Sequence, residues 1–519
     1  MVQFTGITNE RSKNLQNVSN VLEYLERNCA TCGDKIAVEQ EDIQLSYKEL
    51  TEVARKFGSV IARETVSKEP VVILAEKSPL TLAAMFGTVY AGCFYVPVHP
   101  QIPVERIEKI LHVLEAKVVV TTLDMEDKLK ECGFEGSSIY IEEIQSKEVD
   151  EAELEARRAG AEETDNLYGI FTSGSTGTPK CIVVSHKAVI DFISHFTEIF
   201  GITGEDKIGN QAPFDFDVSV KDIYSSLKEG ATLVLIRKEL FALPPGLIDY
   251  LCEKKVTTLI WAVSALCQIS GLKGFDYRVP EQIKTVMFSG ESMPVKQLNI
   301  WRKALPDAMF VNLYGPTEIT CNCTYHIIRE EYTNGSKLPI GKPFPGRKVF
   351  LLDENRQVIT QPGKAGEICV AGESISGGYY HDPKQTEEKF IFYGEEKALT
   401  YCTGDMAFLG EDGLLYFEGR KDFQIKHMGH RIELEEVENA INNLEGITRC
   451  CCVFQKERNR ILAFYMGSEA SGSLRKILKD KLPIYMVPSK MIQVEEVPLS
   501  KNGKVDRNYF KQKVMEEYS

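Results

Sequence analysis

Short apolar runs alternate with helical patterns along the middle of this chain, and this alternation constrains the fold more than any other feature. VVILAE at 71–76 precedes an apolar helix predicted at 79–90, and VVVTT at 118–122 reads as a further buried strand. Strands that alternate with helices are typical of βαβ units, in which parallel strands pair in one sheet. From residue 71 to about 330 the sequence therefore predicts an α/β fold with largely parallel sheets.

The pattern changes twice towards the C-terminus. Between about 340 and 420, short strands are separated by Gly, Pro and Asp turns, which predicts a smaller β-rich subdomain. Beyond it, a charged amphipathic helix is predicted at 431–444, followed by further strands and helices of α+β type. We therefore expect an N-terminal core over 1–420 and a small C-terminal lid domain over 421–519.

Composition excludes several classes of protein. The formal net charge of −14 disfavours nonspecific binding to nucleic acid, which needs clustered Lys and Arg. The N-terminal segment has no signal-peptide pattern, and no apolar run approaches the roughly 18 residues that span a bilayer. The 14 cysteines are scattered through a long chain, which favours free thiols in a reducing compartment. We expect a cytoplasmic monomer that binds neither nucleic acid nor membrane.

Residues 171–180, FTSGSTGTPK, form a loop between two apolar, strand-like runs. Glycine N–H groups can turn towards an anion, and hydroxyls and an ammonium can complete the cradle. The spacing is not that of a Walker A loop, which needs four residues between its glycines. The alternative, a flexible linker, is disfavoured by the flanking strands, so the loop predicts a polyphosphate site. Its candidate ligands are Thr172, Ser173, Gly174, Ser175, Thr176, Gly177 and Lys180.

Four further segments accompany this loop in a fixed order. They are VNLYGPTEIT at 311–320, YCTGD at 401–405, GRKDFQIK at 419–426 and PLSKNGKVDR at 498–507. Together with the loop, they resemble the motifs of the adenylate-forming superfamily, which includes peptide-synthetase adenylation domains, acyl-CoA synthetases and luciferases. The resemblance covers roughly residues 45–510. It implies an enzyme that uses ATP to activate a carboxylate as an acyl-AMP, releases pyrophosphate, and passes the acyl group to a thiol.

The resemblance also implies roles for individual residues. Lys504 would bridge the α-phosphate and the substrate carboxylate, Thr317 would contact the α-phosphate, and Glu318 would help to hold Mg²⁺. Asp405 would accept the ribose hydroxyls, with Arg420 nearby. Each residue alone has an ordinary structural interpretation, and only the joint pattern favours a functional one. The other ATP-binding positions implied are Gly290, Glu291, Asn312, Tyr314 and Gly315.

By the same resemblance, Asp422 is the hinge of the small domain. Family members alternate between one pose that delivers the catalytic lysine and another that opens a tunnel for a thiol, and such hinges need only a few backbone angles to change. Residues 426–438, KHMGHRIELEEVE, resemble the segment that lines this tunnel. Gly429 would allow the close approach of the thiol arm.

Asp217 separates the branches of the superfamily. The segment around it resembles peptide-synthetase adenylation domains and standalone D-alanine–carrier-protein ligases, in which this carboxylate pairs with the substrate α-ammonium. The alternatives are a helix N-cap or an i,i+4 pair with Lys221. The other substrate-binding positions implied are Val218, Lys221, Trp261, Met287, Ser289, Leu313, Cys321 and Asn322.

The substrate itself stays open at this stage. Trp261 is bulky and would shorten the cavity, which favours a small amino acid, either D-alanine-like or short and polar. Lys221 departs from the D-alanine ligases, which tend to carry an apolar residue there. It could meet an acidic or carbonyl-bearing side chain, or point away and pair with Asp222 or Glu229.

The expected partner is a separate phosphopantetheinylated carrier protein, loaded in trans, because no carrier-attachment motif follows Arg507. The basic end formed by Lys501, Lys504, Arg507, Lys511 and Lys513 is a candidate docking patch, and a solvated helix face is the alternative. The sequence disfavours two alternative functions. An acyl- or aryl-CoA ligase is disfavoured by Asp217, and a non-catalytic nucleotide-binding scaffold by the presence of Lys504, Glu318 and Asp405.

Overall fold

The strands that open the βα pattern form a six-stranded sheet in a computed structural model that describes residues 18–174, 178–333, 335–498 and 505–517. All neighbouring strands of this sheet are parallel except β7 and β8. β3, β4 and β5 are buried along their whole length, which explains their continuous apolar sequence. In order across the sheet, the strands are β6 (Ser137–Tyr140), β5 (Val118–Thr121), β3 (Pro70–Leu74), β4 (Phe94–Val98), β7 (Asn166–Thr172) and β8 (Lys180–Ser185).

A nine-stranded sheet follows in sequence and includes the first hairpin of the chain. Its central strands are parallel, and antiparallel strands close both edges. The strands, in order, are β15 (Lys342–Pro343), β14 (Thr324–Ile327), β13 (Met309–Tyr314), β12 (Thr285–Ser289), β11 (Thr258–Ala262), β9 (Lys207–Asn210), β10 (Thr232–Leu235), β1 (Ile36–Gln40) and β2 (Ile43–Ser46). The predicted α/β fold with largely parallel sheets is confirmed.

Helices connect these strands, and some of them begin at polar caps. The Ser46 hydroxyl and the Glu49 carboxylate bind each other's backbone N–H groups at the start of α3, which forms a capping box. Ser78 caps α4, which covers the range predicted for it. The helices of this part are α2 (Leu22–Cys32), α3 (Tyr47–Glu64), α4 (Pro79–Tyr90), α5 (Val104–Leu114), α6 (Glu126–Glu131), α7 (Glu151–Ala159), α8 (His186–Phe200), α9 (Val218–Glu229), α10 (Pro244–Glu253), α11 (Val263–Gly271), α12 (Gly274–Tyr277) and α13 (Val295–Ala304).

One hydrophobic core joins the two sheets. It takes alternate residues of the strands, such as Ile260 of β11 and Met287 of β12, together with apolar side chains of α2, α3, α4, α8 and α9. The intervening residues, Trp261 and Phe288, point to the opposite face and pack in a second core with α10, α11 and α13. Because side chains alternate across a strand, the two sets cannot meet in one cavity.

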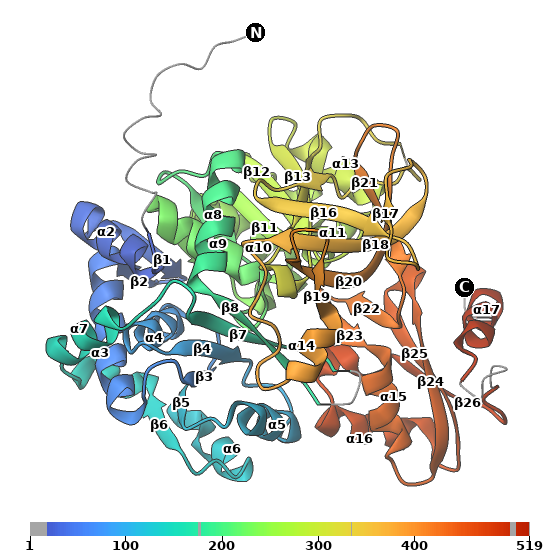
Figure 1. Ribbon diagram of the computed structural model, residues 1–519, viewed down its shortest axis with the longest axis horizontal. Coiled ribbons are helices and arrows are strands. Elements are labelled where there is room, and N and C mark those ends of the chain that lie inside the picture. The colour runs from blue at the N-terminus through green and yellow to red at the C-terminus, as the bar shows by residue number, and fades with distance from the viewer. Residues whose placement is uncertain (1–17, 175–177, 334, 499–504, 518–519) are drawn as a thin grey trace.

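The β-rich part predicted at about 340–420 is an antiparallel sheet beside the nine-stranded sheet (Figure 1). Its strands are β17 (Val358–Ile359), β16 (Arg347–Leu352), β18 (Ala365–Gly372), β20 (Ala398–Leu409) and β19 (Phe390–Tyr393), with β21 (Leu415–Arg420) paired to β20 and α14 (Pro383–Lys389) before β19. Asp405 and Arg420 are register partners on β20 and β21. The pairing brings these two charged residues together.

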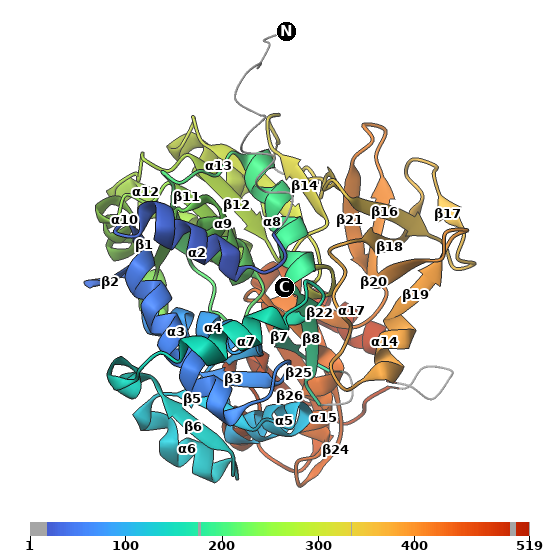
Figure 2. The ribbon, with the colours of Figure 1, turned by 60° about the vertical axis from the view of Figure 1, so that its left-hand side comes forward.

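The C-terminal region, which follows Arg420, builds its own small hydrophobic cores. The predicted helix 431–444 begins only at 434, because the residues before it pair as a strand in a hairpin. The elements of this C-terminal region are β22 (Gln424–His427), β23 (His430–Glu433), α15 (Leu434–Asn442), β24 (Ile447–Gln455), β25 (Arg460–Gly467), α16 (Ser471–Lys481), β26 (Lys490–Gln493) and α17 (Arg507–Glu517). This C-terminal region lies against α5, and Lys481 pairs there with Glu105 at 3.2 Å (Figures 1 and 2).

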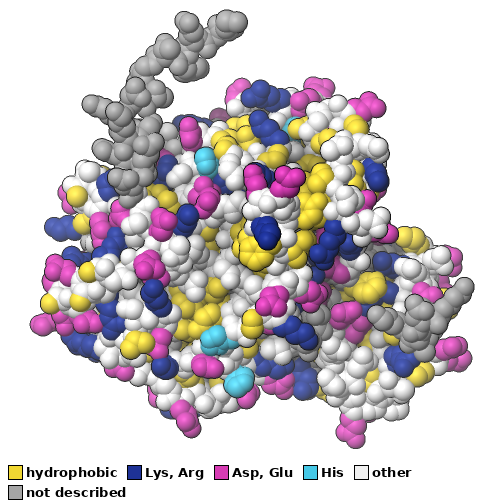
Figure 3. Space-filling view, viewed as in Figure 1, with side chains coloured by type: hydrophobic (Ala, Val, Ile, Leu, Met, Phe, Trp, Pro, Cys, Tyr) yellow, Lys and Arg dark blue, Asp and Glu magenta, His cyan; other side chains and the backbone are white. Residues whose placement is uncertain are grey.

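Acidic and basic side chains are interspersed over the face seen in Figure 3, so the net negative charge is not gathered there. Among the residues that the structure describes, no helix combines the length and apolar character needed to cross a membrane. All of the cysteines are free thiols, as expected from the sequence.

Candidate active site

The predicted site residues meet where α9 begins, where β12 and β13 end, and where β20 and β21 pair. They surround a cavity of about 40 Å³. Eleven predicted residues line it, namely Asp217, Val218, Lys221, Ser289, Gly290, Gly315, Thr317, Cys321, Asn322, Asp405 and Arg420. The remaining wall is formed by Phe216 and Pro316 and by four residues of the hairpin region, Gln424, Lys426, Gly429 and Arg431.

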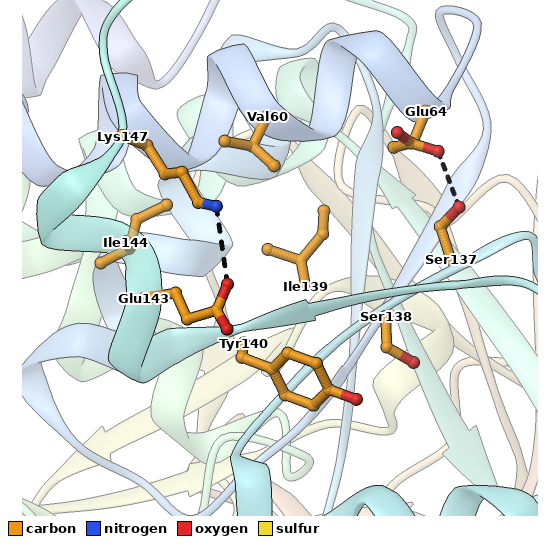
Figure 4. A pocket seen from close by; sticks show the side chains of 9 residues that line it. All are labelled: Val60, Glu64, Ser137, Ser138, Ile139, Tyr140, Glu143, Ile144 and Lys147. Atoms are coloured by element: carbon orange, nitrogen blue, oxygen red, sulfur yellow. Dashed lines mark hydrogen bonds and ion pairs between the residues drawn. The ribbon is translucent and has the colours of Figure 1, made fainter.

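A larger cavity of about 290 Å³ lies at the outer edge of the six-stranded sheet (Figure 4). Its charged groups are already paired with neighbours: Lys147 with Glu143 at 3.5 Å, and Glu64 with the Ser137 hydroxyl at 2.7 Å. No predicted site residue lines it. The smaller cavity is therefore the candidate active site.

Asp405 is buried and lines the cavity. Tyr314 donates its hydroxyl to one carboxylate oxygen of Asp405, and Arg420 pairs with the other. Arg420 also donates from Nε to Asp422 Oδ1 at 2.6 Å, so the predicted hinge residue is tied to the predicted ribose site. Asn312 lies outside the cavity lining and donates its amide to the Pro339 carbonyl at 2.8 Å.

Glu318 is 1 % exposed and accepts two hydrogen bonds from outside its own loop. Its Oε1 accepts from the Tyr379 hydroxyl at 2.8 Å, and its Oε2 accepts from Arg431 Nη1 at 2.6 Å. Burial alone would raise the pKa of Glu318, but Arg431 and the nearby tyrosine hydroxyls outweigh burial, so the pKa lies below its ordinary value. Glu318 is therefore a charged carboxylate paired with a cation of β23.

The glycine-rich loop already binds a carboxylate. Gly174 N–H donates to Glu436 Oε2 at 3.1 Å, and Glu436 Oε1 pairs with Arg106 at 2.6 Å. The Ser173 hydroxyl donates to the Arg431 carbonyl and accepts from Glu433 N–H. In the described part of the loop, the Gly174 N–H thus donates to an anion, which here is an acid of α15.

Of the other residues predicted for the loop site, the structure describes Lys180 and Thr172. Lys180 lies 5.7 Å from the centre of the Tyr379 ring, and burial lowers its pKa. Thr172 ends β7, opposite Lys180 in the register. Ser175, Thr176, Gly177 and Lys504 lie outside the described residues.

The turn of the β22–β23 hairpin closes the cavity. Gly429 has φ +83°, donates its N–H to Glu291 Oε1 at 2.9 Å, and lies close to Ala262 and Phe216. Only glycine adopts this backbone conformation without strain. The segment 426–438, expected at a thiol tunnel, is therefore seated in the site.

Asp217 stands just before α9 and is 8 % exposed. Within the described residues its side chain makes no capping hydrogen bond, so the N-cap interpretation is not supported. Burial raises the pKa of Asp217, while Lys221 opposes that effect. Its carboxylate lines the cavity and is available to a cationic group.

Lys221 faces the cavity. Its Nζ donates to Ser289 Oγ at 3.1 Å and to Asn322 Oδ1 at 3.0 Å. The alternative in which it pairs with Asp222 is not observed, since Asp222 accepts from Asn210 at 2.7 Å.

Trp261 does not line the cavity, contrary to expectation. Its indole N–H donates to the Gly209 carbonyl at 2.7 Å and its ring packs on Phe241, because Trp261 points to the outer face of β11. Met287 and Leu313 are buried in the shared core and also lie outside the lining. The small volume therefore arises from the residues around Asp217 and from Gly429.

Sequence reasoning missed several groups of the site. Arg431 and Glu436 lie in or beside a segment singled out as a whole, but nothing marked them individually. Arg106 is 330 residues away from Glu436, and no local pattern signals the pair. Arg507 was assigned to a basic docking patch, yet it is buried, pairs with Glu438 at 2.6 Å and stacks on Phe423. It is not available to a partner in this pose.

Comparison with known proteins agrees with this geometry. Residues 25–380 match the AMP-binding enzyme family, and residues 436–504 match the AMP-binding enzyme C-terminal domain. The chain therefore belongs to the AMP-binding enzyme family. The predicted membership in the adenylate-forming enzymes, and with it the ligase class, is confirmed.

Similar proteins and structures carry related names. A D-alanine--D-alanyl carrier protein ligase of Listeria monocytogenes is 31% identical over 510 residues, which cover 94% of this chain and 98% of the relative. Zwittermicin A synthase ZmaJ of Bacillus cereus is 31% identical over 487 residues, 91% of each chain. The Vibrio cholerae adenylation domain AlmE, solved with glycyl-adenosine-5'-phosphate, is 21% identical with a TM-score of 0.83 and covers 100% of both chains. The structural likeness shows that this chain has the adenylation-domain fold.

Proposed function

We propose that this enzyme activates an amino acid with ATP as an aminoacyl-AMP, releases pyrophosphate, and transfers the aminoacyl group to the phosphopantetheine thiol of a separate carrier protein. The observation that carries the proposal is the buried Asp217 carboxylate on the same cavity as Thr317 and Asp405. A carboxylate here matches a substrate α-ammonium, which a CoA ligase for simple acids has no reason to bind. The similarity to D-alanine--D-alanyl carrier protein ligases supports the same reaction.

No protein nucleophile is required for the first step, because the substrate carboxylate attacks the α-phosphorus of ATP and pyrophosphate leaves. The protein's contribution is to hold the two reactants in line and to stabilise charge. Thr317 and Asp217 both line the cavity, and we assign Thr317 to the phosphate side and Asp217 to the amino acid side. Lys504 is proposed to bridge the two from the small domain.

Mg²⁺ fits the residues present. Glu318 offers a charged carboxylate, and within the described parts of the chain no cluster of three acidic, His or Cys side chains is arranged to hold a metal by itself. Mg²⁺ typically uses one or two carboxylates together with substrate phosphates, and when bound it neutralises phosphate charge. Since Arg431 occupies Glu318 Oε2 here, Arg431 must leave before Glu318 can serve as a ligand.

The observed pose fits the second step of the proposed cycle. Glu436 and Arg431 occupy the loop and Glu318, the two places proposed for the pyrophosphate end of MgATP. A phosphate and the Glu436 carboxylate cannot share the Gly174 N–H. We infer that residues 421–519 swing about Asp422, and that this pose follows pyrophosphate release.

An ATP–pyrophosphate exchange assay over all amino acids, with both enantiomers and with matched acids that lack the amine, tests the first step. Exchange that depends on the α-amine is expected. Transfer to a phosphopantetheinylated carrier protein, compared with transfer to free CoA, tests the second. Exchange with amine-free acids and preference for CoA would instead indicate an acyl-CoA ligase.

A further inference from the structure

The substrate cavity contains a buried cation that the proposed reaction does not use. Lys221 is 1 % exposed, and both acceptors of its Nζ, Ser289 Oγ and Asn322 Oδ1, are neutral. Among the described residues it forms no ion pair with a carboxylate. An ammonium has three donors, so one remains for a ligand in the cavity. A buried charge without a direct counter-charge is costly, which makes this lysine unusual for a merely structural residue.

The adjacent buried acid does not supply the missing charge. Asp222 accepts from Asn210 Nδ2 at 2.7 Å, and Lys77 donates to Asn210 Oδ1 at 2.9 Å. Asp222 and Lys77 thus face each other through the Asn210 amide. Burial raises the pKa of Asp222 to about 8 and lowers that of Lys77 to about 7. Asp222 therefore has Asn210 as its hydrogen-bond partner, and Asp217 is the acid that lines the cavity together with Lys221.

Substrate binding changes the surroundings of Lys221. Before binding, Asp217 and Lys221 are the acid and the base that share the substrate side of the cavity wall. If the α-ammonium of the substrate binds Asp217, as the proposed function requires, it takes this carboxylate from Lys221, and the α-carboxylate of the substrate must face the α-phosphate of ATP. In a dry site, Lys221 is then left without an anionic partner, which is unfavourable. A side-chain carboxylate on the substrate would supply that partner.

The donors around Lys221 also favour a carboxylate. Asn322 must turn its oxygen to Lys221, because an ammonium cannot accept, and its NH₂ group is then left to donate. The Ser289 hydroxyl accepts from Lys221 and keeps its own proton to donate. Three donor groups therefore meet at one place, which suits a group that only accepts.

The size of the cavity limits the side chain. A buried water needs about 10–15 Å³ of such space, so a cavity of about 40 Å³ holds only a few atoms. Cys321 and Val218 bound it on one side and Gly429 on another. A carboxylate on a short stem fits this space better than one on a long stem.

We propose that Lys221, Ser289 and Asn322 form a subsite for the side-chain carboxylate of a short acidic amino acid of aspartate type, whose α-ammonium pairs with Asp217. This inference rests on the proposed function and names its substrate class. A D-alanine substrate would leave the Lys221 charge unmatched.

The test is ATP–pyrophosphate exchange by the full-length protein with both enantiomers of aspartate, asparagine, glutamate, serine and alanine. Aspartate is expected to have the highest kcat/KM. In K221M, which keeps the length of the side chain and removes its charge, the ratio of kcat/KM for aspartate to kcat/KM for asparagine should fall by about 100-fold. K187M, on the exposed surface of α8, is the matched control and should not change the preference.

The outcomes separate the two proposals. Efficient exchange with alanine or serine, but not with aspartate, would overturn the subsite and leave amino-acid adenylation standing. Equal rates for aspartate and asparagine would overturn the carboxylate assignment, and this comparison needs no variant, so it holds even if K221M fails to fold. Exchange with no amino acid at all would overturn the proposed function, and the subsite with it.

Discussion

The two halves of the active site are held together differently. In the phosphate half, Gly174 and Glu318 bind groups of the C-terminal region, namely Glu436 and Arg431. In the substrate half, Lys221 is held by Ser289 and Asn322, which belong to the large N-terminal part. In the proposed cycle, the first set of contacts breaks when MgATP binds, whereas the second can persist. We therefore propose that the substrate half is preorganised and that the phosphate half exchanges partners.

The largest effect is expected in the substrate half. D217N removes the carboxylate proposed for the α-ammonium and leaves the amide in its place, so amino-acid-dependent exchange should fall by about 100- to 1000-fold. Binding of ATP alone, measured by calorimetry, should weaken far less, because among the described residues Asp217 contacts the phosphate half only through the Thr317 side chain. D276N, at an exposed position, serves as the control. Equal weakening of ATP binding would show that the two halves are not independent.

A smaller effect is expected in the phosphate half. E436A removes the carboxylate from the Gly174 N–H and leaves Arg106 unpaired, which destabilises the observed pose. Thioester formation, measured in a single turnover from preformed adenylate, should slow by about 30-fold. This effect corresponds to part of the free energy that is lost when one partner of a buried ion pair is removed. Adenylate formation should not slow, because it needs the loop free.

The neighbouring acid of α15 provides the control for this variant. Glu435 is exposed, so E435A should leave both half-reactions unchanged. If E436A slows adenylate formation as much as transfer, Glu436 does not act through the pose.

Much of the fold was predictable because its signals are local. The buried strands β3 and β5 are continuous apolar runs, and α3 and α4 carry their own caps. The face of Trp261 was not predictable, since a strand buried on both sides shows no polar alternation to tell its two faces apart. The direction of Lys221 depends on where β12 places Ser289, 68 residues away. The Arg106–Glu436 pair depends on how the C-terminal region docks, which no local pattern encodes.

A change of pH is expected to have a smaller effect on thioester formation than the E436A substitution. His430 stacks on Tyr485 at 3.6 Å, and burial, with His427, His99 and Arg106 nearby, lowers its pKa from 6.5 to about 4. The observed pose therefore favours neutral His430. The stability that this neutral side chain gives to the pose is fully present above pH 6.5 and is lost as the pH falls from 6.5 towards 4. At pH 5.5, transfer from preformed adenylate should be slowed by up to about tenfold relative to a variant that cannot titrate.

H430F is that variant, because it keeps an aromatic ring for Tyr485 and has no titrating group. Ionisation of the carrier thiol affects both proteins equally and cancels in the ratio of their rates. Identical pH profiles for the two proteins would contradict the role of His430 in this pose.

The central claim is that one active site serves two half-reactions in two poses of residues 421–519. D422P tests it most directly, because proline fixes one backbone angle at the proposed hinge and removes a backbone N–H. Adenylate formation and carrier loading are measured separately on the same preparation. We expect adenylate formation within about threefold of the wild type and carrier loading slowed by more than about 100-fold. Equal loss of both half-reactions would contradict the claim.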